Sequence, residues 1–433
     1  MLPPSPKQPA LVQRVRYLRD PIGYMDRCQR ELGDTYMIEL VNPGMVFVST
    51  PALAKQVYTS SEDDLVAGEA KIAVFGKILG HSSTLLLDGA EHLKRRRLLL
   101  PRFRGELAQK LAPAMTEACT TTLAELPTDR TFALHAFMHR IAFQVISRSL
   151  FAATPPARIA KLEAALRNFA HDAVTSRLLM FPALQRDFGR YSPWGHVVRV
   201  VSRARREVLA EIHMRRTMAV TSEDILGLLL DAKNDDGTAL TDSEIVDEIL
   251  TMVAAGHETT SMALTWLCYA VYTRPAILAK LRSETGELTE RAYLQATVRE
   301  SLRMYSVIPN GSGRIAKRAF QLGGFEVPAG AMVTVAFHAV HRTLEVFADA
   351  ETFRPERFLD AKYSPYESIP FGGGARRCLG MPFALFELEL VLSKIVERFD
   401  LEIVQRDVVP MWRGRFLTPT KGLLVRATPV TRA

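Results

Sequence analysis

The chain has few cysteines, and no two of them are spaced as a paired-cysteine motif. Its 433 residues include only Cys28, Cys119, Cys268 and Cys378, which lie far apart in the sequence. No two of them have the Cys-x-x-Cys spacing, which argues against a zinc ribbon and against a thioredoxin-like redox motif. Four cysteines in so long a chain do not build a disulfide framework, so we expect a reduced, cytoplasmic setting.

The sequence also lacks the apolar stretch of a signal peptide or an N-terminal membrane anchor, since it begins MLPPSPK. Its most apolar segment, 249–272, carries His257 and Glu258 near its centre. An ionised group buried in a membrane costs several kcal/mol. We therefore predict a long helix through the core of a soluble protein and no transmembrane segment.

The net charge is mild for a chain of this length, because 55 Lys and Arg stand against 47 Asp and Glu, for a net +8. Apolar residues make up 48% and charged residues 24%, which excludes disordered, collagenous and low-complexity classes. Length alone suggests two to three domains at ~150 residues each. No repeat or linker composition divides the chain, so we expect one domain over 1–433, with a small β-rich part at about 30–65.

The pattern of apolar and turn residues predicts a mainly α protein with small β-sheets, an α+β fold. Thr241 and Glu244 form a capping-box pattern, and the helix that they begin should stop before Pro275. The other predicted elements are strands at 35–41 and 45–49 forming a hairpin, mostly helix from 51 to 275, a helix at 290–305, strands at 314–318, 325–327 and 331–337, and a helix at 379–399.

The strongest chemical signal is the segment FGGGARRCLG, which covers 371–380. A glycine-rich loop here delivers Cys378 to the start of a helix, where backbone N–H groups and the helix dipole favour a thiolate. Such a sulfur could be a nucleophile or a metal ligand. A lone cysteine is more often a buried structural residue, but Cys378 is surrounded by an aromatic residue, three glycines and two arginines.

This segment resembles the haem-ligand signature of the cytochrome P450 family, F-x-x-G-x-R-x-C-x-G. All of its specified positions match, at Phe371, Gly374, Arg376, Cys378 and Gly380. The resemblance implies haem b with the Cys378 thiolate as the iron ligand, and a triangular-prism-like P450 domain whose long central helix crosses over the haem. Within the family the chain is similar to soluble bacterial members, especially oxidisers of long-chain lipids and terpenoids.

Two further segments carry the resemblance. Glu300 and Arg303 match the family's E-x-x-R pattern, and Arg357 follows in the segment PERF. By itself an i,i+3 pair is a routine surface feature of a helix; the resemblance implies that these three residues form a buried charge triad behind the cysteine loop.

The segment AGHETT, 255–260, matches the family's oxygen-binding stretch in the middle of the long helix. The resemblance implies that Gly256 leaves space for oxygen and that Thr259 and Glu258 are catalytic, moving protons during oxygen activation. Alternatively, Thr259 bonds a carbonyl one turn back, as helix threonines commonly do. The HExxH zinc motif is excluded, because Ser261 stands where the second histidine would be.

The resemblance also implies which residues hold the haem. Its propionates need cationic partners, and the candidates are His92, Arg96, Arg314 and Arg376, although Arg314 could also be a surface strand charge. Many family members have Trp where His92 stands. Phe371 would cover the proximal face, and the backbone near Gly380 would donate to the sulfur, which tunes the iron.

At this length we expect no fused reductase, and the resemblance then implies that a separate ferredoxin or flavodoxin, with its own reductase, supplies the electrons. Basic residues cluster at Lys94, Arg95, Arg96, Arg97, Arg102 and Arg104, and Arg376 and Arg377 flank the cysteine. An acidic electron donor would be steered there. The alternatives are a solvated basic helix face and nucleic-acid binding, which no interleaved aromatic residue supports. We expect a monomer.

The substrate-facing segments implied by the resemblance are rich in apolar side chains, which indicates an apolar pocket. The candidates are Phe75, Ile78, Leu79, Ala255, Val307, Ile308, Phe416 and Leu417, and Asn310 could orient a polar group or simply cap its loop. We therefore expect a monooxygenase that hydroxylates a terpenoid, steroid or fatty acid with O2. The alternatives are a haem-thiolate peroxygenase or isomerase, and a haem-binding sensor or carrier.

Overall fold

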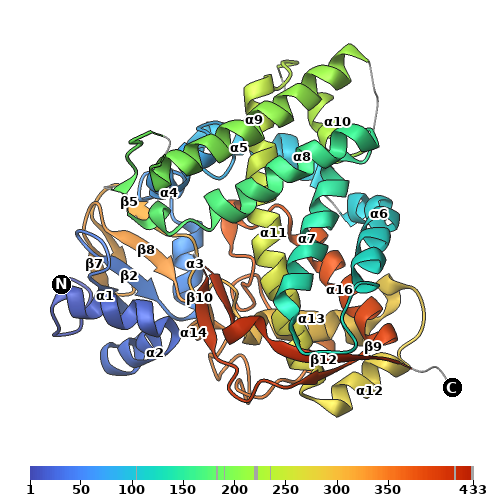
Figure 1. Ribbon diagram of the computed structural model, residues 1–433. Coiled ribbons are helices and arrows are strands. Elements are labelled where there is room, and N and C mark those ends of the chain that lie inside the picture. The colour runs from blue at the N-terminus through green and yellow to red at the C-terminus, as the bar shows by residue number, and fades with distance from the viewer. Residues whose placement is uncertain are drawn as a thin grey trace.

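The computed structural model describes residues 1–103, 105–181, 184–189, 191–218, 223–234, 236–413 and 416–430. Helices dominate these segments (Figure 1). They are α1 (Ala10–Arg19), α2 (Pro21–Leu32), α3 (Pro51–Thr59), α4 (Glu69–Leu79), α5 (Gly89–Leu99), α6 (Gly105–Leu123), α7 (Leu134–Phe151), α8 (Pro156–Asn168), α9 (Pro193–Thr217), α10 (Ile225–Leu230), α11 (Asp242–Tyr272), α12 (Pro275–Ser283), α13 (Ala292–Met304), α14 (Phe337–Val340), α15 (Arg357–Asp360) and α16 (Met381–Arg398).

Helix α11 runs through the middle of the molecule, and α7 and α16 pack against it. The predicted capping box is present: Thr241 Oγ1 accepts from the Glu244 N–H at 3.3 Å, and the Glu244 carboxylate accepts from the Thr241 N–H at 2.8 Å. The helix has 31 residues, so at 1.5 Å per residue it is about 46 Å long. It ends at Tyr272, close to the predicted stop.

Short strands form four small sheets. The largest sheet has five strands, in the order β1 (Thr35–Ile38), β2 (Met45–Val48), β8 (Met332–Val335), β5 (Arg314–Ala316) and β3 (Leu65–Val66). A second sheet has three strands, in the order β4 (Phe132–Ala133), β12 (Leu424–Pro429) and β9 (Phe399–Ile403). The other two sheets are pairs, β6 (Phe320–Leu322) with β7 (Phe325–Val327) and β10 (Pro410–Arg413) with β11 (Phe416–Pro419). The predicted hairpin is confirmed, since β1 and β2 pair antiparallel. Only the β2–β8 pair is parallel among the described residues.

Several elements were not predicted. Helices α1 and α2 precede the first strand, and strands β9 to β12 lie near the carboxyl terminus, in a stretch for which no element was predicted. Strand β12 pairs with both β9 and β4, so the end of the chain returns to residues 132–133. Nothing local signals such pairing.

The core is built around α11, whose buried residues lie on most of its circumference. Buried carboxylates on this helix include Asp247, Glu248 and Glu258. Such groups need partners when they are removed from water, and they therefore mark where α11 makes its polar contacts. Within the part of the chain that the structure describes, no helix is long and apolar enough to cross a membrane.

Candidate functional site

The loop before α16 needs its glycines. Gly372 and Gly374 have φ values of +70° and +64°, which residues with a side chain rarely adopt. A Cβ atom on Gly374 would stand 2.4 Å from the carbonyl oxygen of Tyr58, and one on Gly373 would stand 2.6 Å from the Tyr58 ring. The glycines therefore let the loop lie directly against α3.

Cys378 follows this loop, and its own N–H donates to the carbonyl of Phe371 at 2.9 Å. Its side chain keeps accessible surface, although it lies deep enough in the protein that burial raises the pKa of the thiol. The backbone N–H groups of Gly380 and Met381 and the charges of Arg96 and Arg377 lower that pKa in part. The expected donors near Gly380 are thus present, but they offset burial without reversing it.

The four expected cations lie close together. Charge from Arg376 and Arg96 acts on His92, and charge from Arg314 acts on Arg376. His92 is 2% exposed, and burial together with these cations lowers its pKa to about 4, so the ring is neutral at neutral pH. Its Nδ1 is buried without a hydrogen-bond partner in the described part of the chain.

Arg314 is not the surface strand charge that the sequence left open. It is 6% exposed, Nη1 donates to the Val57 carbonyl at 2.6 Å, and the guanidinium lies 5.0 Å from the centre of the Tyr58 ring. Burial lowers the pKa of Arg314. A buried cation so close to Arg376 favours a negatively charged ligand beside both.

Sequence reasoning missed Asp88, which completes this group. Its carboxylate accepts from the N–H groups of Gly68 at 2.7 Å and Glu69 at 2.8 Å, and it also forms an ion pair with Arg376. Asp88 therefore links the first turn of α4 to the cysteine loop. Because Asp88 and Arg376 are separated by 288 residues, no local pattern marks the pair.

The middle of α11 presents two different faces. Ala255 is exposed, and Gly256 and Thr259 are partly exposed, whereas His257 and Glu258 are buried. Thr259 Oγ1 donates to the Ala255 carbonyl at 2.5 Å, as a helix threonine can. A Cβ on Gly256 would meet only Ile146, at an ordinary 3.6 Å, so packing within the protein does not by itself require glycine there.

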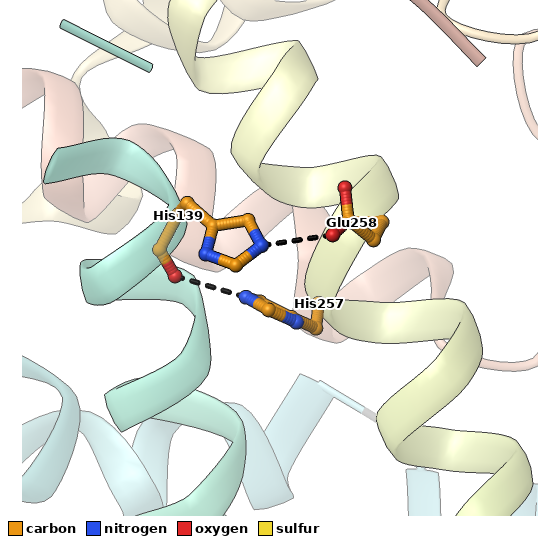
Figure 2. A group of neighbouring side chains, drawn as sticks. All are labelled: His139, His257 and Glu258. Atoms are coloured by element: carbon orange, nitrogen blue, oxygen red, sulfur yellow. Dashed lines mark hydrogen bonds and ion pairs between the residues drawn. The ribbon is translucent and has the colours of Figure 1, made fainter. Parts of the chain in front are cut away.

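Glu258 points to α7 and not to the face that carries Thr259 (Figure 2). Its Oε1 lies 2.8 Å from Nε2 of His139. The neighbouring His257 also faces α7, where its Nε2 lies 3.0 Å from the His139 carbonyl oxygen. The sequence did not single out His139, because only the packing of α7 on α11 brings it here.

The three residues expected to form a charge triad do so. The Glu300 carboxylate accepts from Arg303 Nε at 2.7 Å and from Arg357 Nε at 3.1 Å. None of the three is more than 2% exposed. Arg303 Nη1 also donates to the carbonyl of His341 at 2.8 Å, and the Nε2 of His341 accepts from the Ile369 N–H at 2.9 Å. The triad therefore supports the chain two residues before Phe371.

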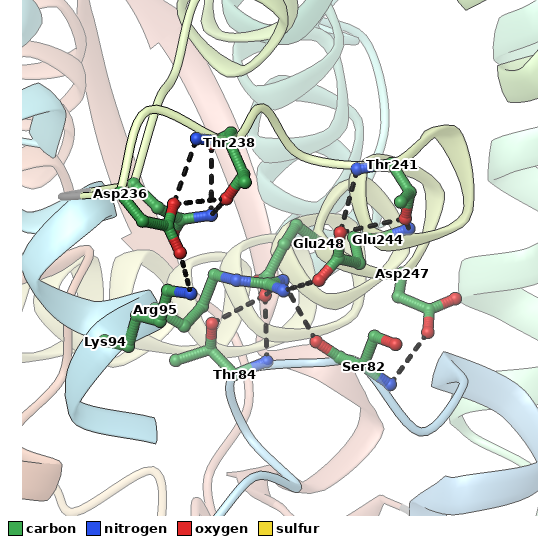
Figure 3. A network of polar contacts seen from close by, with 11 residues as sticks. Ser82, Thr84, Lys94, Arg95, Asp236, Thr238, Thr241, Glu244, Asp247 and Glu248 are labelled. Atoms are coloured by element: carbon green, nitrogen blue, oxygen red, sulfur yellow. Dashed lines mark hydrogen bonds and ion pairs between the residues drawn. The ribbon is translucent and has the colours of Figure 1, made fainter. Parts of the chain in front are cut away.

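The expected docking role of Arg95 is wrong. Arg95 is 7% exposed and forms ion pairs with Glu248 at 3.0 Å and with Glu244, both on α11 (Figure 3). It also donates to the Ser82 carbonyl at 3.1 Å, and Lys94 pairs with Asp236 at 3.1 Å. Arg95 therefore holds α5 and the loop before it on α11.

The other residues of the basic cluster differ from Arg95 in their exposure to solvent. Arg97 is exposed, and Arg377 is half-buried. Arg104 lies outside the described residues, as does the side chain of Arg102. The surface available to an acidic partner therefore centres on Arg97 and Arg377.

The structure divides the pocket candidates. Ile78, Leu79 and Leu417 are at most 1% exposed and belong to the core, and Val307 is 9% exposed. Ala255, Ile308, Phe75 and Phe416 keep accessible surface. Asn310 is engaged elsewhere, because its Oδ1 accepts from the Tyr17 hydroxyl at 2.9 Å.

These residues fit a haem. Cys378 offers one soft sulfur ligand, and Arg96, Arg314 and Arg376 supply positive charge for two carboxylates, with the neutral His92 ring among them as a hydrogen-bonding group. The buried Nδ1 of His92 is an acceptor or donor still in need of a partner.

Comparison with known proteins agrees with this site. The family description "Cytochrome P450" matches residues 3–427. A Mycobacterium tuberculosis protein provisionally named cytochrome P450 135B1 is 32% identical over 98% of this chain and 91% of its own length. Another from that organism, provisionally named cytochrome P450 138, is 32% identical over 93% of this chain and 90% of its own length.

The solved structure of cyanobacterial CYP120A1 with bound retinoic acid superposes with a TM-score of 0.85, at 23% identity, over 99% of both chains. That likeness shows the fold. The fold and the cysteine loop define a haem-thiolate protein. The chain belongs to the cytochrome P450 family, whose members bind haem through a cysteine thiolate and act as monooxygenases.

Proposed function

We propose that this protein inserts one oxygen atom from O2 into a lipophilic small molecule of the terpenoid, steroid or fatty-acid class, within a single domain. A separate ferredoxin or flavodoxin, with its reductase, supplies the electrons. The observation that carries the proposal is the glycine-rich loop, closed by the hydrogen bond from the Cys378 N–H to the Phe371 carbonyl, which presents an accessible Cys378 side chain just before α16. The retinoic acid in the CYP120A1 structure supports a long apolar substrate.

In this mechanism the bound haem supplies oxygen activation, and a thiolate ligand favours cleavage of the O–O bond. The chain supplies the rest. Gly380 and Met381 stabilise the negative sulfur, and the cations around His92 bind the carboxylates. Thr259, on the accessible face of α11, would hold the proton that the reaction needs, and Glu258, which is hydrogen-bonded to His139 on α7, would replenish it.

The proposal is tested by the spectrum of the reduced, CO-bound holoprotein, where a strongly red-shifted Soret band reports thiolate ligation. Retinoic acid, long-chain fatty acids and sesquiterpenes are then titrated for a substrate-induced spin shift. A normal Soret band would remove the haem-thiolate assignment. The red-shifted band without a spin shift from any of these would remove the substrate class alone.

Thr259→Ala is expected to uncouple electron use from product formation. The variant loses the only hydroxyl on the accessible face of the 255–260 segment, so product per electron pair should fall by at least about tenfold, with hydrogen peroxide released. Electron consumption and product are measured together. Thr120→Ala removes the same i−4 hydrogen bond from an exposed position on α6 and should leave coupling unchanged. Equal coupling in both variants would reject the role of Thr259.

Arg97→Glu is expected to slow reduction by a ferredoxin roughly threefold to tenfold at low ionic strength, since charge complementarity raises association rates. The loss should shrink as salt screens the charge. Arg19→Glu makes the same change of net charge at an exposed position on α1 and is the control. If both variants are reduced at one rate, Arg97 takes no part in docking.

A further inference from the structure

A cavity of about 270 Å³ lies apart from the cysteine loop, where α11 and α13 meet α14 and the β10–β11 pair. Cys378, Arg314 and Arg376 are not among the described residues that line it. Its volume is close to the lower end of the range for small-molecule sites, about 300–1,000 Å³. The cavity is therefore distinct from the haem site and large enough for a small ligand.

One wall of the cavity is aromatic. The rings of Trp266 and Tyr305 stack with their centres 5.0 Å apart, and the ring of Tyr269 meets that of Tyr305 edge to face at 5.8 Å. Trp266 is 3% exposed, and its Nε1 donates to the Leu417 carbonyl at 3.1 Å, which holds this aromatic wall in place. Such rings offer apolar surface and edge-to-face contacts to a further aromatic ring.

The polar groups of the cavity are short of partners. Among the described residues, Arg342 reaches a carboxylate through Nε alone, which donates to Glu351 at 2.7 Å. Its Nη1 and Nη2 donate to the carbonyls of His338 and Met304 at 3.4 Å, whereas an ordinary N–H···O bond measures about 2.7–3.2 Å. The Oγ of Ser306 is buried with no hydrogen-bond partner in the described part of the chain. A guanidinium binds a carboxylate most strongly through two parallel N–H···O bonds, and Arg342 has N–H groups left for them.

Glu351 is a weak competitor for Arg342. The Glu351 side chain is 76% exposed and that of Arg342 is 19% exposed, so the carboxylate lies at the mouth of the cavity and the guanidinium lies deeper. An ion pair with so exposed a member contributes little. Burial lowers the pKa of Arg342, and the charge of Glu351 opposes that shift in part. A carboxylate held inside the cavity meets the guanidinium in less water, where the attraction between opposite charges is stronger.

We propose that the cavity binds a small aromatic carboxylate, which acts as an effector of the substrate site. The ligand's carboxylate takes the Arg342 guanidinium from Glu351, and its ring packs on the aromatic wall. The Ser306 hydroxyl supplies a further hydrogen-bonding group.

The effector role follows from a wall that the cavity shares with the expected substrate pocket. Leu417 lines the cavity, its carbonyl accepts from Trp266, and its N–H donates to the Val307 carbonyl at 2.8 Å. Ser306, which also lines the cavity, directly precedes Val307. A ligand on this wall therefore acts on both segments that are expected to contact the substrate. This part of the inference rests on the proposed monooxygenase function, whereas binding of the ligand does not.

Binding is measured by isothermal titration calorimetry of the holoprotein with 3-phenylpropionate, and with 3-phenylpropanol, which has the same ring and chain but no charge. The acid is expected to bind at least about tenfold more tightly, because charge-assisted hydrogen bonds to Arg342 are stronger than neutral ones. Glu351→Gln removes the competing carboxylate and should tighten binding of the acid roughly threefold to tenfold, with no change for the alcohol. Glu345→Gln makes the same change of charge at an exposed position outside the cavity lining and is the control.

Two results would overturn the carboxylate site. One is equal affinity for the acid and the alcohol in the wild-type protein. The other is an affinity for the acid that is no higher in Glu351→Gln than in Glu345→Gln, which is also what binding of the acid in the haem pocket would give. Both variants keep Arg342, so neither result depends on removing a partly buried cation.

Effector action is measured as the Kd of the panel member that gives the largest spin shift, with and without saturating 3-phenylpropionate. This Kd should change by about fivefold or more, and the Kd of the acid should change by the same factor when the substrate is present. An unchanged substrate Kd would overturn the effector role. A wild-type protein without the red-shifted Soret band would remove the proposed function and the effector role with it, while calorimetry would still decide whether the cavity binds the carboxylate.

Discussion

Cys378→Ser is expected to lose the red-shifted Soret band of the reduced CO complex and essentially all monooxygenase activity. The backbone N–H groups of Gly380 and Met381 and the positive charges of Arg96 and Arg377 all favour the thiolate form of Cys378. A serine hydroxyl has neither the soft, polarisable lone pairs nor the acidity to replace a thiolate. The loss of activity on removing the ligand itself should therefore be larger than the roughly 10–100-fold losses typical of mutating the groups that hydrogen-bond to a metal ligand.

Cys28→Ala is the control that tests whether the loss of the red-shifted Soret band and of activity is specific to Cys378. Cys28 lies far from Cys378 in the sequence. It is buried on α2 among the aromatic residues beside the five-stranded sheet, and burial raises the pKa of its thiol to about 11. Cys28→Ala should keep the Soret band and lose only a little stability. A Cys378→Ser protein that kept the red-shifted band would transfer the ligand role to another residue and end the present assignment.

Local chemistry explains which parts of the fold the sequence could predict. The start of α11 is determined locally, by the capping box of Thr241 and Glu244, which are three residues apart. The β1–β2 hairpin is also local, because its two strands are joined by a short turn. By contrast, β12 pairs with β4 across almost 300 residues of chain, and both strands are short. Pairing over such distances is decided by the packing of the whole core, and a strand of two residues leaves almost no pattern to detect.

The same division holds in the site. The cysteine loop is a contiguous segment, so its residues were identified together. Arg95 and Arg96 are neighbours in α5, yet adjacent helix positions point about 100° apart. The sequence cannot say which one faces the core, and Arg95 proved to be the partner of Glu248. His139 and Glu258 are 119 residues apart, and only helix packing reveals their contact.

Glu300→Gln is expected to cost about 3–5 kcal/mol of unfolding free energy, the usual result of leaving buried charges without their partner. The carboxylate accepts from Arg303 at 2.7 Å and 2.8 Å, from Arg357 at 3.1 Å, and from the Arg354 N–H at 2.9 Å. An amide of the same shape would leave the buried guanidinium groups of Arg303 and Arg357 without a negatively charged partner among the residues that the structure describes. Chemical denaturation of the holoprotein measures the loss.

The effect should also reach the haem site, through a chain of contacts. Arg303 holds the His341 carbonyl, and His341 accepts from the Ile369 N–H just before the cysteine loop. Burial beside Arg303 and Arg342 lowers the pKa of His341 to about 3, so the ring stays neutral and its Nε2 remains an acceptor. Glu300→Gln should consequently retain less haem during purification, as measured by the ratio of Soret to protein absorbance.

Glu351→Gln is the matched control for this substitution. Glu351 also pairs with an arginine, Arg342, at 2.7 Å, but its side chain is 76% exposed, and an exposed pair is worth only about 0–1 kcal/mol. Equal losses of stability in the two variants would mean that burial does not amplify the Glu300 interactions. A Glu300→Gln protein that unfolds more easily yet keeps full haem occupancy would instead confine the triad to global stability, and would break the proposed connection through His341 to the cysteine loop.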